Sequence, residues 1–320
     1  MKAALSVDLD NKWSYMKTHG DAAWQSFPSY HDLLVPRMLD TFDELGLKIT
    51  FFIVGQDAAL DPNAEVFGEI ARRGHEIGNH SYHHEPWMHR RSDREIDEEL
   101  ARAEEQIERV TGARPKGFRG PGFTQSPSIL ETLVRRGYLY DGSSLPTFIG
   151  PLARAYYFRS VKLSAQEMAD REDLFGQLSD GFRPNRQHRI QLTNGSIAEI
   201  PVTTMPGSRL PIHISYVLYM ATVSPAAAMA YFRSALALCK LTRTEPSILL
   251  HPLDFLHGSE CKELAFFPAM SLDREVKARV LRDSIRELAA GFDVVPMREI
   301  VRPAQAPNPT PNLRDPAAVR

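Results

Sequence analysis

Short apolar runs alternate with longer amphipathic segments along most of this chain. The apolar runs at residues 2–7, 48–54, 75–77, 116–119, 138–143, 247–250 and 293–296 are typical of buried strands. Between them, apolar residues recur with helical spacing over residues 29–45, 63–73, 92–110, 126–137, 225–238 and 271–290. Strands that alternate with helices predict a parallel sheet or barrel, so the expected fold class is α/β.

Three stretches depart from this alternation. Residues 11–27 carry scattered aromatic side chains, and we expect an irregular loop over a strand end. One catalytic domain is expected over residues 1–300, with an insertion at about 151–190 that either shapes substrate choice or only connects the flanking parts. Prolines at 303, 307, 309, 311 and 316 predict a disordered tail over 301–320, and residues 191–202 predict a hairpin around Asn194 and Gly195.

The amino-acid composition argues against some classes of function. The chain is 43% hydrophobic and 24% charged with a net charge of −2, which is ordinary for a globular protein and gives no field for binding nucleic acid. Two cysteines and no recognisable export signal favour a reducing, cytoplasmic location. Residues 210–232 carry no charged side chain, but Pro211 and Pro225 argue against a transmembrane helix. The alternative for this stretch is an apolar patch that makes peripheral contact with a lipid-linked substrate.

A histidine-rich segment, GHEIGNHSYHHEP at residues 74–86, is the strongest chemical signal. His80 and His84 are spaced i, i+4, so a helical turn after His80 would project both imidazoles from one face. Two ring nitrogens at that separation can share one metal ion, and a carboxylate from elsewhere is the usual complement in a catalytic site. The alternative is a histidine-rich surface turn.

Two carboxylates, Asp8 and Asp10, follow the first predicted strand. Buried carboxylates are costly unless they are paired or bind a metal, and active sites of barrels and open α/β folds lie at the carboxyl ends of strands. One aspartate can therefore supply the third metal ligand and the other a base. The alternative is a turn that only ends the strand.

Taken together and in order, these motifs resemble those of the polysaccharide deacetylases, the NodB-homology group or carbohydrate esterase family four. The resemblance rests on Asp8 and Asp10 in SVDLDN, on His80 and His84 in HSYHH, on Arg119 in GFRGPGF, on Asp141 in YDGSS and on His251 in ILLHPLD. In this family the first two aspartates are usually adjacent, whereas Leu9 separates them here. This D-x-D form is similar to a subgroup that also includes peptidoglycan and small-amide hydrolases.

The resemblance implies a distorted (β/α)7-type barrel and a role for each of these residues. Asp10, His80 and His84 would bind one divalent metal, with zinc expected and Co²⁺, Mn²⁺ or Ni²⁺ as alternatives. Asp8 would be the general base, paired with Arg119, although the roles of Asp8 and Asp10 can be exchanged at this stage. His251 would be the general acid, oriented by Asp141.

The implied activity is hydrolysis of an N-acyl group, most simply N-acetyl, from an amino sugar. The substrate would be a polysaccharide, an oligosaccharide or an intermediate of glycan biosynthesis. The alternatives are an amidase or deformylase acting on a small cyclic amide or a lipid-linked amino sugar, and a catalytically silent binding protein on the same scaffold. A homo-oligomer is left open by the sequence.

Overall fold

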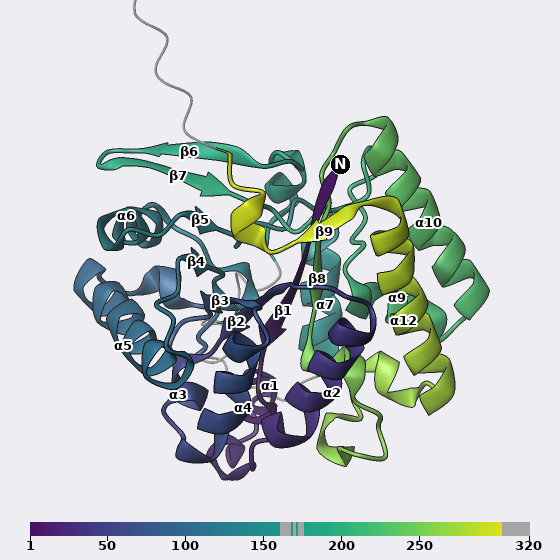
Figure 1. Cartoon of the computed structure of the whole chain (residues 1–320), viewed down its shortest axis with the longest axis horizontal. Helices are drawn as coiled ribbons and strands as arrows, with labels where there is room; N and C mark the ends of the chain where they lie inside the picture. The colour runs from purple at the N-terminus through teal and green to yellow at the C-terminus, as the bar shows by residue number, and fades with distance from the viewer. Residues whose placement is uncertain (161–167, 169–170, 172–175, 303–320) are drawn as a thin grey trace, which may run out of the picture.

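The computed structural model of the chain describes residues 1–160, 168, 171 and 176–302 (Figure 1). The expected tail therefore lies outside the described residues except for its first two positions, as do most of residues 161–175 within the expected insertion. The division into one catalytic domain with an insertion stays a prediction.

Nine strands of the described chain form one sheet in the order β6-β7-β5-β4-β3-β2-β1-β8, and β9 pairs with β1. All paired neighbours are parallel except the β6–β7 hairpin. The strands are β1 (Lys2–Leu9), β2 (Thr50–Ile53), β3 (Glu76–Asn79), β4 (Gly117–Phe118), β5 (Tyr140–Asp141), β6 (His188–Leu192), β7 (Gly195–Glu199), β8 (Ser247–Leu250) and β9 (Asp293–Val295).

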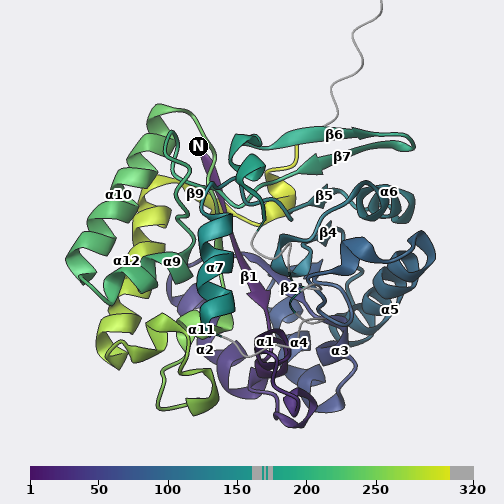
Figure 2. The ribbon, with the colours of Figure 1, turned by 180° about the vertical axis from the view of Figure 1, so that it is seen from behind.

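Helices connect these strands and lie around the outside of the sheet (Figures 1 and 2). They are α1 (Lys12–His19), α2 (His31–Glu44), α3 (Gly55–Ala58), α4 (Asp61–Arg72), α5 (Asp93–Thr111), α6 (Pro127–Arg136), α7 (Gly150–Ser160), α9 (Ile214–Ala221), α10 (Pro225–Leu241), α11 (Pro252–Phe255) and α12 (Arg274–Gly291). Ser92 and Glu95 form a capping box at the start of α5.

An irregular segment after β7 connects the two ends of the sheet, because it hydrogen-bonds to residues at and just after β5 on one side and to β8 on the other. The backbone N–H of Ile200 donates to the carbonyl of Asp141 (2.9 Å), and that of Val202 donates to the carbonyl of Ser144 (2.8 Å). The N–H of Thr203 then donates to the carbonyl of Ser247 on β8 (2.9 Å). The parallel strands thus wrap into a distorted barrel, which confirms the expected fold class.

The alternation of side chains along β1 decides which residues enter the barrel. Leu5, Val7 and Leu9 pack in the large core between the sheet and the helices, whereas Ala4 packs in a smaller cluster with residues of β2, β5 and β7. Ser6 and Asp8 share the face of Ala4 and contact the buried Arg119. Because side chains repeat every two residues along a strand, Asp8 points to this same inner face, and Asp10, one residue beyond the end of β1, lines the same cavity as Asp8.

One local prediction was wrong, and the expected hairpin is present with its turn one residue earlier than predicted. Residues 12–19 form helix α1 instead of a loop, because the side chain of Asn11 accepts the N–H of Lys12, Gly20 ends the helix with φ of 87°, and Trp13 and Met16 are buried. In the hairpin, Leu192 pairs with Gly195, so the turn is formed by Thr193 and Asn194. In the described part of the chain, no helix is long and apolar enough to cross a membrane.

Candidate active site

Three side chains that the sequence singled out converge just beyond the carboxyl ends of β1 and β3. Oδ1 of Asp10 lies 3.2 Å from Nε2 of His80 and 3.0 Å from Nε2 of His84. All three residues are buried, and each offers a ligand atom within 4.8 Å of the other two. Among the described residues, this is the group of at least three such side chains whose spacing suits a metal ion.

The hydrogen bonds around His80 test whether this cluster fits a metal. Nδ1 of His80 lies 2.7 Å from the carbonyl oxygen of Arg119, and a carbonyl only accepts, so Nδ1 carries the proton. Nε2 of His80 faces the buried Oδ1 of Asp10, and although burial alone would lower the pKa of His80, the carboxylates of Asp8 and Asp10 raise it. Nε2 and Oδ1 are thus placed to share a cation, either a proton or a metal ion, and a carboxylate with two imidazoles is a ligand set that fits a divalent metal.

The pKa of Asp10 is consistent with a role as a metal ligand. Burial alone would raise the pKa of Asp10, but the imidazoles of His84 and His80 hold that pKa well below its usual range. The carboxylate is therefore ionised at neutral pH, which is the state that binds a cation.

The two histidines come together through a strained turn and not through the helix that their spacing suggested. Ser81 and His84 both have left-handed backbone conformations, with φ of 61° and 51°. The hydroxyl of Ser81 accepts the N–H of His84 (3.1 Å), and the buried Glu99 of α5 accepts the N–H of His83 (2.6 Å). Left-handed backbone at non-glycine residues is costly and persists only where surrounding contacts impose it, as Glu99 and Ser81 do here.

Asp8 lies next to this cluster and is held by Arg119, as expected. Nη1 of Arg119 donates to Oδ1 of Asp8 (2.8 Å) and to Oγ of Ser6 (2.8 Å), while Nε donates to the carbonyl of Gly142 (2.9 Å). The guanidinium is fully buried and lies over the ring of Phe52, 4.4 Å from its centroid. These contacts fix the orientation of the Asp8 carboxylate and compensate its charge.

His251 follows β8 and is positioned by residues that differ from the prediction. Ser215 on α9 lies with its Oγ 2.9 Å from Nδ1 of His251 and donates to Oδ2 of Asp254 (3.1 Å). The backbone N–H of His251 donates to the same Oδ2 (2.8 Å). Since the single hydroxyl proton of Ser215 goes to Asp254, its oxygen accepts from Nδ1–H of the ring. Burial raises the pKa of Asp254, although His251 opposes that shift.

The prediction that Asp141 orients His251 was wrong. Side chains of β5 alternate, so Tyr140 enters the barrel while Asp141 points to the opposite face. There Asp141 accepts hydrogen bonds from Ser143 (2.5 Å) and Gln125 (2.6 Å), and Gln125 also donates to Glu199 of β7 (2.9 Å). Burial and the charge of Asp141 raise the pKa of Glu199 well above its usual range.

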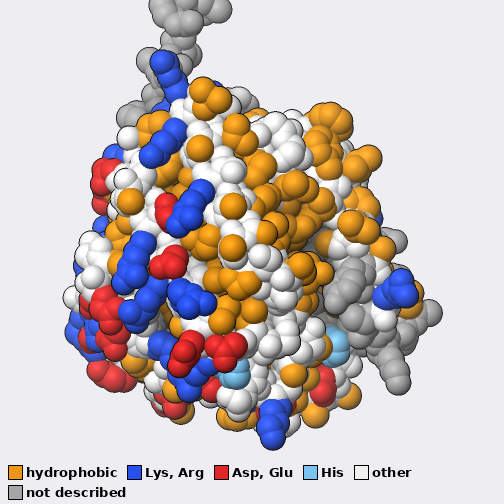
Figure 3. Space-filling model, turned by 90° about the vertical axis from the view of Figure 1, so that its right-hand side faces the viewer, with side chains coloured by type: hydrophobic (Ala, Val, Ile, Leu, Met, Phe, Trp, Pro, Cys, Tyr) orange, Lys and Arg blue, Asp and Glu red, His pale blue; other side chains and the backbone are white. Residues whose placement is uncertain are grey.

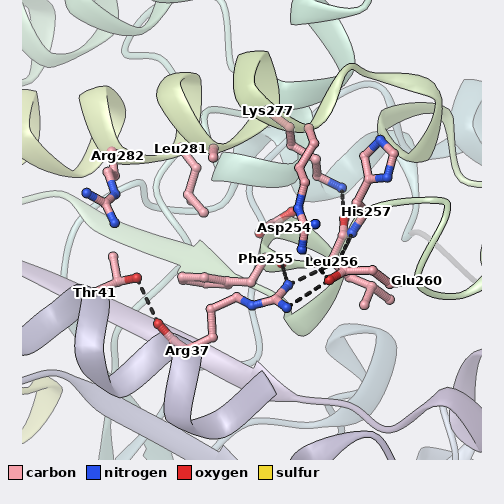
Figure 4. A pocket seen from close by; sticks show the side chains of 12 residues that line it. Arg37, Thr41, Asp254, Phe255, Leu256, His257, Glu260, Lys277, Leu281 and Arg282 are labelled. Atoms are coloured by element: carbon pink, nitrogen blue, oxygen red, sulfur yellow. Dashed lines mark hydrogen bonds and ion pairs between the residues drawn. The ribbon is translucent and has the colours of Figure 1, made fainter. Parts of the chain in front are cut away.

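The segment that carries Asp254 is anchored from behind by two cations (Figure 4). Nη1 of Arg37 on α2 donates to the carbonyl of Phe255 (2.7 Å), and its Nη2 donates to Glu260 (2.8 Å). The buried Lys277 of α12 donates to the carbonyls of Leu253 and Leu256 (2.7 Å each), and burial lowers its pKa to about 8. These contacts hold the main chain on both sides of Asp254, and a small cavity of about 150 Å³ lies beside them.

Of the seven residues that the sequence singled out for the site, all except Arg119 and Asp141 open into one cavity of about 460 Å³. Asp8, Asp10, His80, His84 and His251 line it together with Ser215 and His213. Sequence reasoning missed Ser215 and His213, because neither belongs to a motif. Asp254 was visible as the third residue after His251, a spacing typical of a side chain that caps the preceding backbone N–H.

Comparison with known sequences finds a family match over part of the chain. Residues 16–140 match the sequence model of the family described as Polysaccharide deacetylase. The match includes His80, His84 and Arg119, while Asp8, Asp10 and His251 lie outside it.

Curated relatives agree with this match over part of the chain. A peptidoglycan-N-acetylglucosamine deacetylase of Bacillus cereus is 36% identical over 86 residues, which are 27% of this chain and 30% of that protein. A peptidoglycan deacetylase of Helicobacter pylori is 31% identical over 125 residues, 39% of this chain and 40% of that protein. The peptidoglycan deacetylase-like protein FGM2 of Gibberella zeae is 30% identical over 209 residues, 63% of this chain and 57% of that protein. In each case the chain spans less than two thirds of the relative's own length.

One crystal structure extends the agreement in fold to nearly the whole chain. A Mycobacterium smegmatis protein assigned to the polysaccharide deacetylases superimposes with a TM-score of 0.62 at 23% identity, covering 97% of this chain and 94% of that protein. The sequence match and the partial matches to curated relatives show that this chain is similar to polysaccharide deacetylases over residues 16–140, and the superposition shows that the fold is shared over nearly the whole chain.

Proposed function

We propose that this protein is a metal-dependent hydrolase that removes an N-acyl group, most simply acetyl, from an amino sugar. The observation that carries the proposal is the arrangement in one cavity of the Asp10–His80–His84 cluster, the carboxylate of Asp8 and the imidazole of His251. A hydrolase of amides needs an electrophile for the carbonyl, a base for water and an acid for the amine, and these groups offer all three.

Asp10, His80 and His84 would hold the metal, with zinc favoured by the nitrogen-rich ligand set. A divalent metal bound there would polarise the amide carbonyl and lower the pKa of water from about 15.7 toward about 7. The hydrogen bond from Nδ1 of His80 to the carbonyl of Arg119 keeps the ligating nitrogen of that ring free of a proton.

Asp8 is the general base in this proposal. Nη1 of Arg119 donates to Oδ1 of Asp8 (2.8 Å) and is itself positioned by a hydrogen bond to Oγ of Ser6 (2.8 Å), so one carboxylate oxygen of Asp8 is committed to Arg119 and the other can accept a proton from water. As that proton moves to Asp8, the water oxygen forms a bond to the acyl carbon.

His251 is the general acid. Ser215 accepts from Nδ1–H, so the proton that His251 transfers to the leaving nitrogen is the one on Nε2. Protonation lets the carbon–nitrogen bond break, because an unprotonated amine is a poor leaving group. The products are a carboxylic acid and the free amino sugar, and the acidic Asp254 with Ser215 keeps the ring oriented for the next turnover.

The test is release of amine from the tetramer of N-acetylglucosamine by the purified full chain. We expect activity to disappear when a chelator removes the metal and to return on addition of one equivalent of zinc. The variant His80→Ala should show no such recovery, whereas exposed Glu105→Gln should behave as the parent protein does. Release from a small cyclic amide in place of the sugar would reject the sugar substrate, and activity that resists the chelator would reject the metal.

A further inference from the structure

Much of the wall of the active-site cavity is apolar. Away from the candidate catalytic groups its apolar lining includes Leu145, Ile149, Ala153, Pro211, Phe266 and Phe267, and its polar lining includes Tyr15, Thr18, His19, Thr147 and Tyr157. None of the described residues that line the cavity is Lys, Arg, Glu, Asn or Gln. Beyond the candidate catalytic groups, the described lining therefore offers a substrate hydroxyls and imidazoles but no side-chain amide and no charged guanidinium or ammonium group.

A ladder of rings, here called the α9 ladder, leads from His251 toward the surface along α9. The rings of His251 and His213 are 6.4 Å apart between centroids, those of His213 and Tyr216 are 5.9 Å apart, and those of Tyr216 and Tyr219 are 6.2 Å apart. Tyr216 and Tyr219 are spaced i, i+3 on the helix, so both project from one side of it. Burial lowers the pKa of His213 to about 3, with the charge of His251 adding to the shift, so its ring is neutral at physiological pH.

The ladder continues onto an apolar part of the surface. Tyr219 is 46% exposed and Val223, one turn later, is 90% exposed. On the face that carries α9 and α10, hydrophobic side chains spread across the middle and upper right, while most charged side chains gather on the left (Figure 3). Tyr216 lines the cavity, Tyr219 and Val223 lie beyond it toward solvent, and α9 carries no charged residue.

We propose that the substrate of this site carries an alkyl chain that lies along the α9 ladder from Tyr216 to Tyr219. This inference rests on the proposed function and narrows its substrate class to an amphipathic N-acyl amino sugar. The chain can be attached in two ways, as a long N-acyl group or as a lipid aglycone, and both present the same chemistry to the ladder. A longer oligosaccharide stacked on the same rings is the competing occupant, and among the described lining residues the cavity offers it no Lys, Arg, Glu, Asn or Gln side chain.

Equilibrium binding to the zinc-loaded full chain tests the proposal without relying on turnover. The first series consists of the methyl, butyl and octyl β-glycosides of N-acetylglucosamine, used below their aggregation concentrations. The second consists of N-acetyl, N-butyryl and N-octanoyl glucosamine. We expect Kd to fall at least about 50-fold from the shortest to the longest member of one series, which corresponds to three buried methylenes at about fourfold each. The series that responds identifies how the chain is attached.

Two ladder variants and a matched control sharpen the test. Tyr216→Ser should weaken binding of both the four-carbon and the eight-carbon members. Tyr219→Ser changes a half-exposed side chain, so it should fold normally and weaken only the eight-carbon member. Leu241→Ser, which is 80% exposed at the end of α10, should leave both unchanged.

Kd values that do not depend on alkyl length in either series would overturn the inference, as would tighter binding of the N-acetylglucosamine tetramer than of every alkyl compound. Amine release is recorded in parallel. Binding that strengthens with chain length, without amine release from any compound, would refute the proposed function and leave the α9 ladder assigned as an alkyl site.

Discussion

The backbone N–H of His251 donates a 2.8 Å hydrogen bond to Oδ2 of Asp254, the carboxylate that also accepts from Ser215. The imidazole is thus oriented by a residue three positions later in its own chain segment and by a hydroxyl from α9. Arg37 and Lys277 anchor that segment from the other side. The orientation of His251, the candidate acid, therefore depends on side chains that gather in space around the end of β8.

We expect Asp254→Asn to lower kcat by about 10 to 100-fold with little change in KM, because the imidazolium loses the charge that stabilises it. The alkaline limb of the pH profile of kcat should move to lower pH. Kinetics across pH 5 to 9 would measure both effects. Asp141→Asn is the control, since that carboxylate faces away from the site. A shifted profile in Asp141→Asn and a normal one in Asp254→Asn would restore the original assignment.

Replacement of Asp8 by Asn separates the base from the metal ligands. The amide keeps the size of the side chain and can still accept from Arg119, but it takes no proton from water. We predict that the variant binds zinc as the parent protein does and that kcat falls by about 10²-fold or more. Unchanged turnover with full zinc occupancy would reject Asp8 as the base.

Position 78 on β3 has room only for glycine, because the ring of Phe52, which packs against Arg119, lies against it. A Cβ atom at this position would lie 2.4 Å from the ring of Phe52, on which the guanidinium rests. Gly78→Ala should therefore destabilise the protein by about 1–3 kcal/mol through overpacking, measured by urea unfolding. Phe52→Leu should relieve the clash, so the double variant should be more stable than the sum of the two single effects predicts. Additive effects would show that the clash does not determine the cost.

Protonation of Glu260 should account for part of the loss of folding stability at low pH. Hydrogen bonds from Arg37, with the nearby charge of Arg274, lower the pKa of Glu260 to about 2, below its ordinary value near 4.5. A carboxyl whose pKa is lower in the folded state contributes stability that is present above about 4.5 and is lost as pH falls toward 2. Glu260→Gln should cost about 1 kcal/mol at pH 7 and flatten the loss of stability between pH 4.5 and 2. The exposed Glu105→Gln should change neither, and equal acid profiles in parent and Glu260→Gln would contradict the assignment.

The sequence predicted the fold class and most elements because strand and helix periods were distinct. It also predicted which side chains meet at the site, since the D-x-D spacing and the carboxyl ends of parallel strands bring Asp8, Asp10 and His80 to one inner edge. The same period-two argument applied to β5 would have turned Asp141 away from His251, because Tyr140 enters the barrel.

Other features depended on contacts that a sequence does not display. The turn that joins His80 and His84 owes its left-handed residues to Glu99 on α5. Ser215 reaches His251 only because α9 packs beside β8, and no motif marks it. Helix α1 spans eight residues with two buried apolar side chains toward its core, too short a pattern to distinguish from a loop.

The most direct test of the central claim is zinc titration of the metal-free full chain, compared between the parent protein, Asp10→Asn and Asp8→Asn. We predict one equivalent of tightly bound zinc in the parent and in Asp8→Asn, and binding weakened by at least about 100-fold in Asp10→Asn. Equal zinc affinity in Asp10→Asn and the parent, or loss of zinc in Asp8→Asn, would contradict a metal site built from Asp10, His80 and His84.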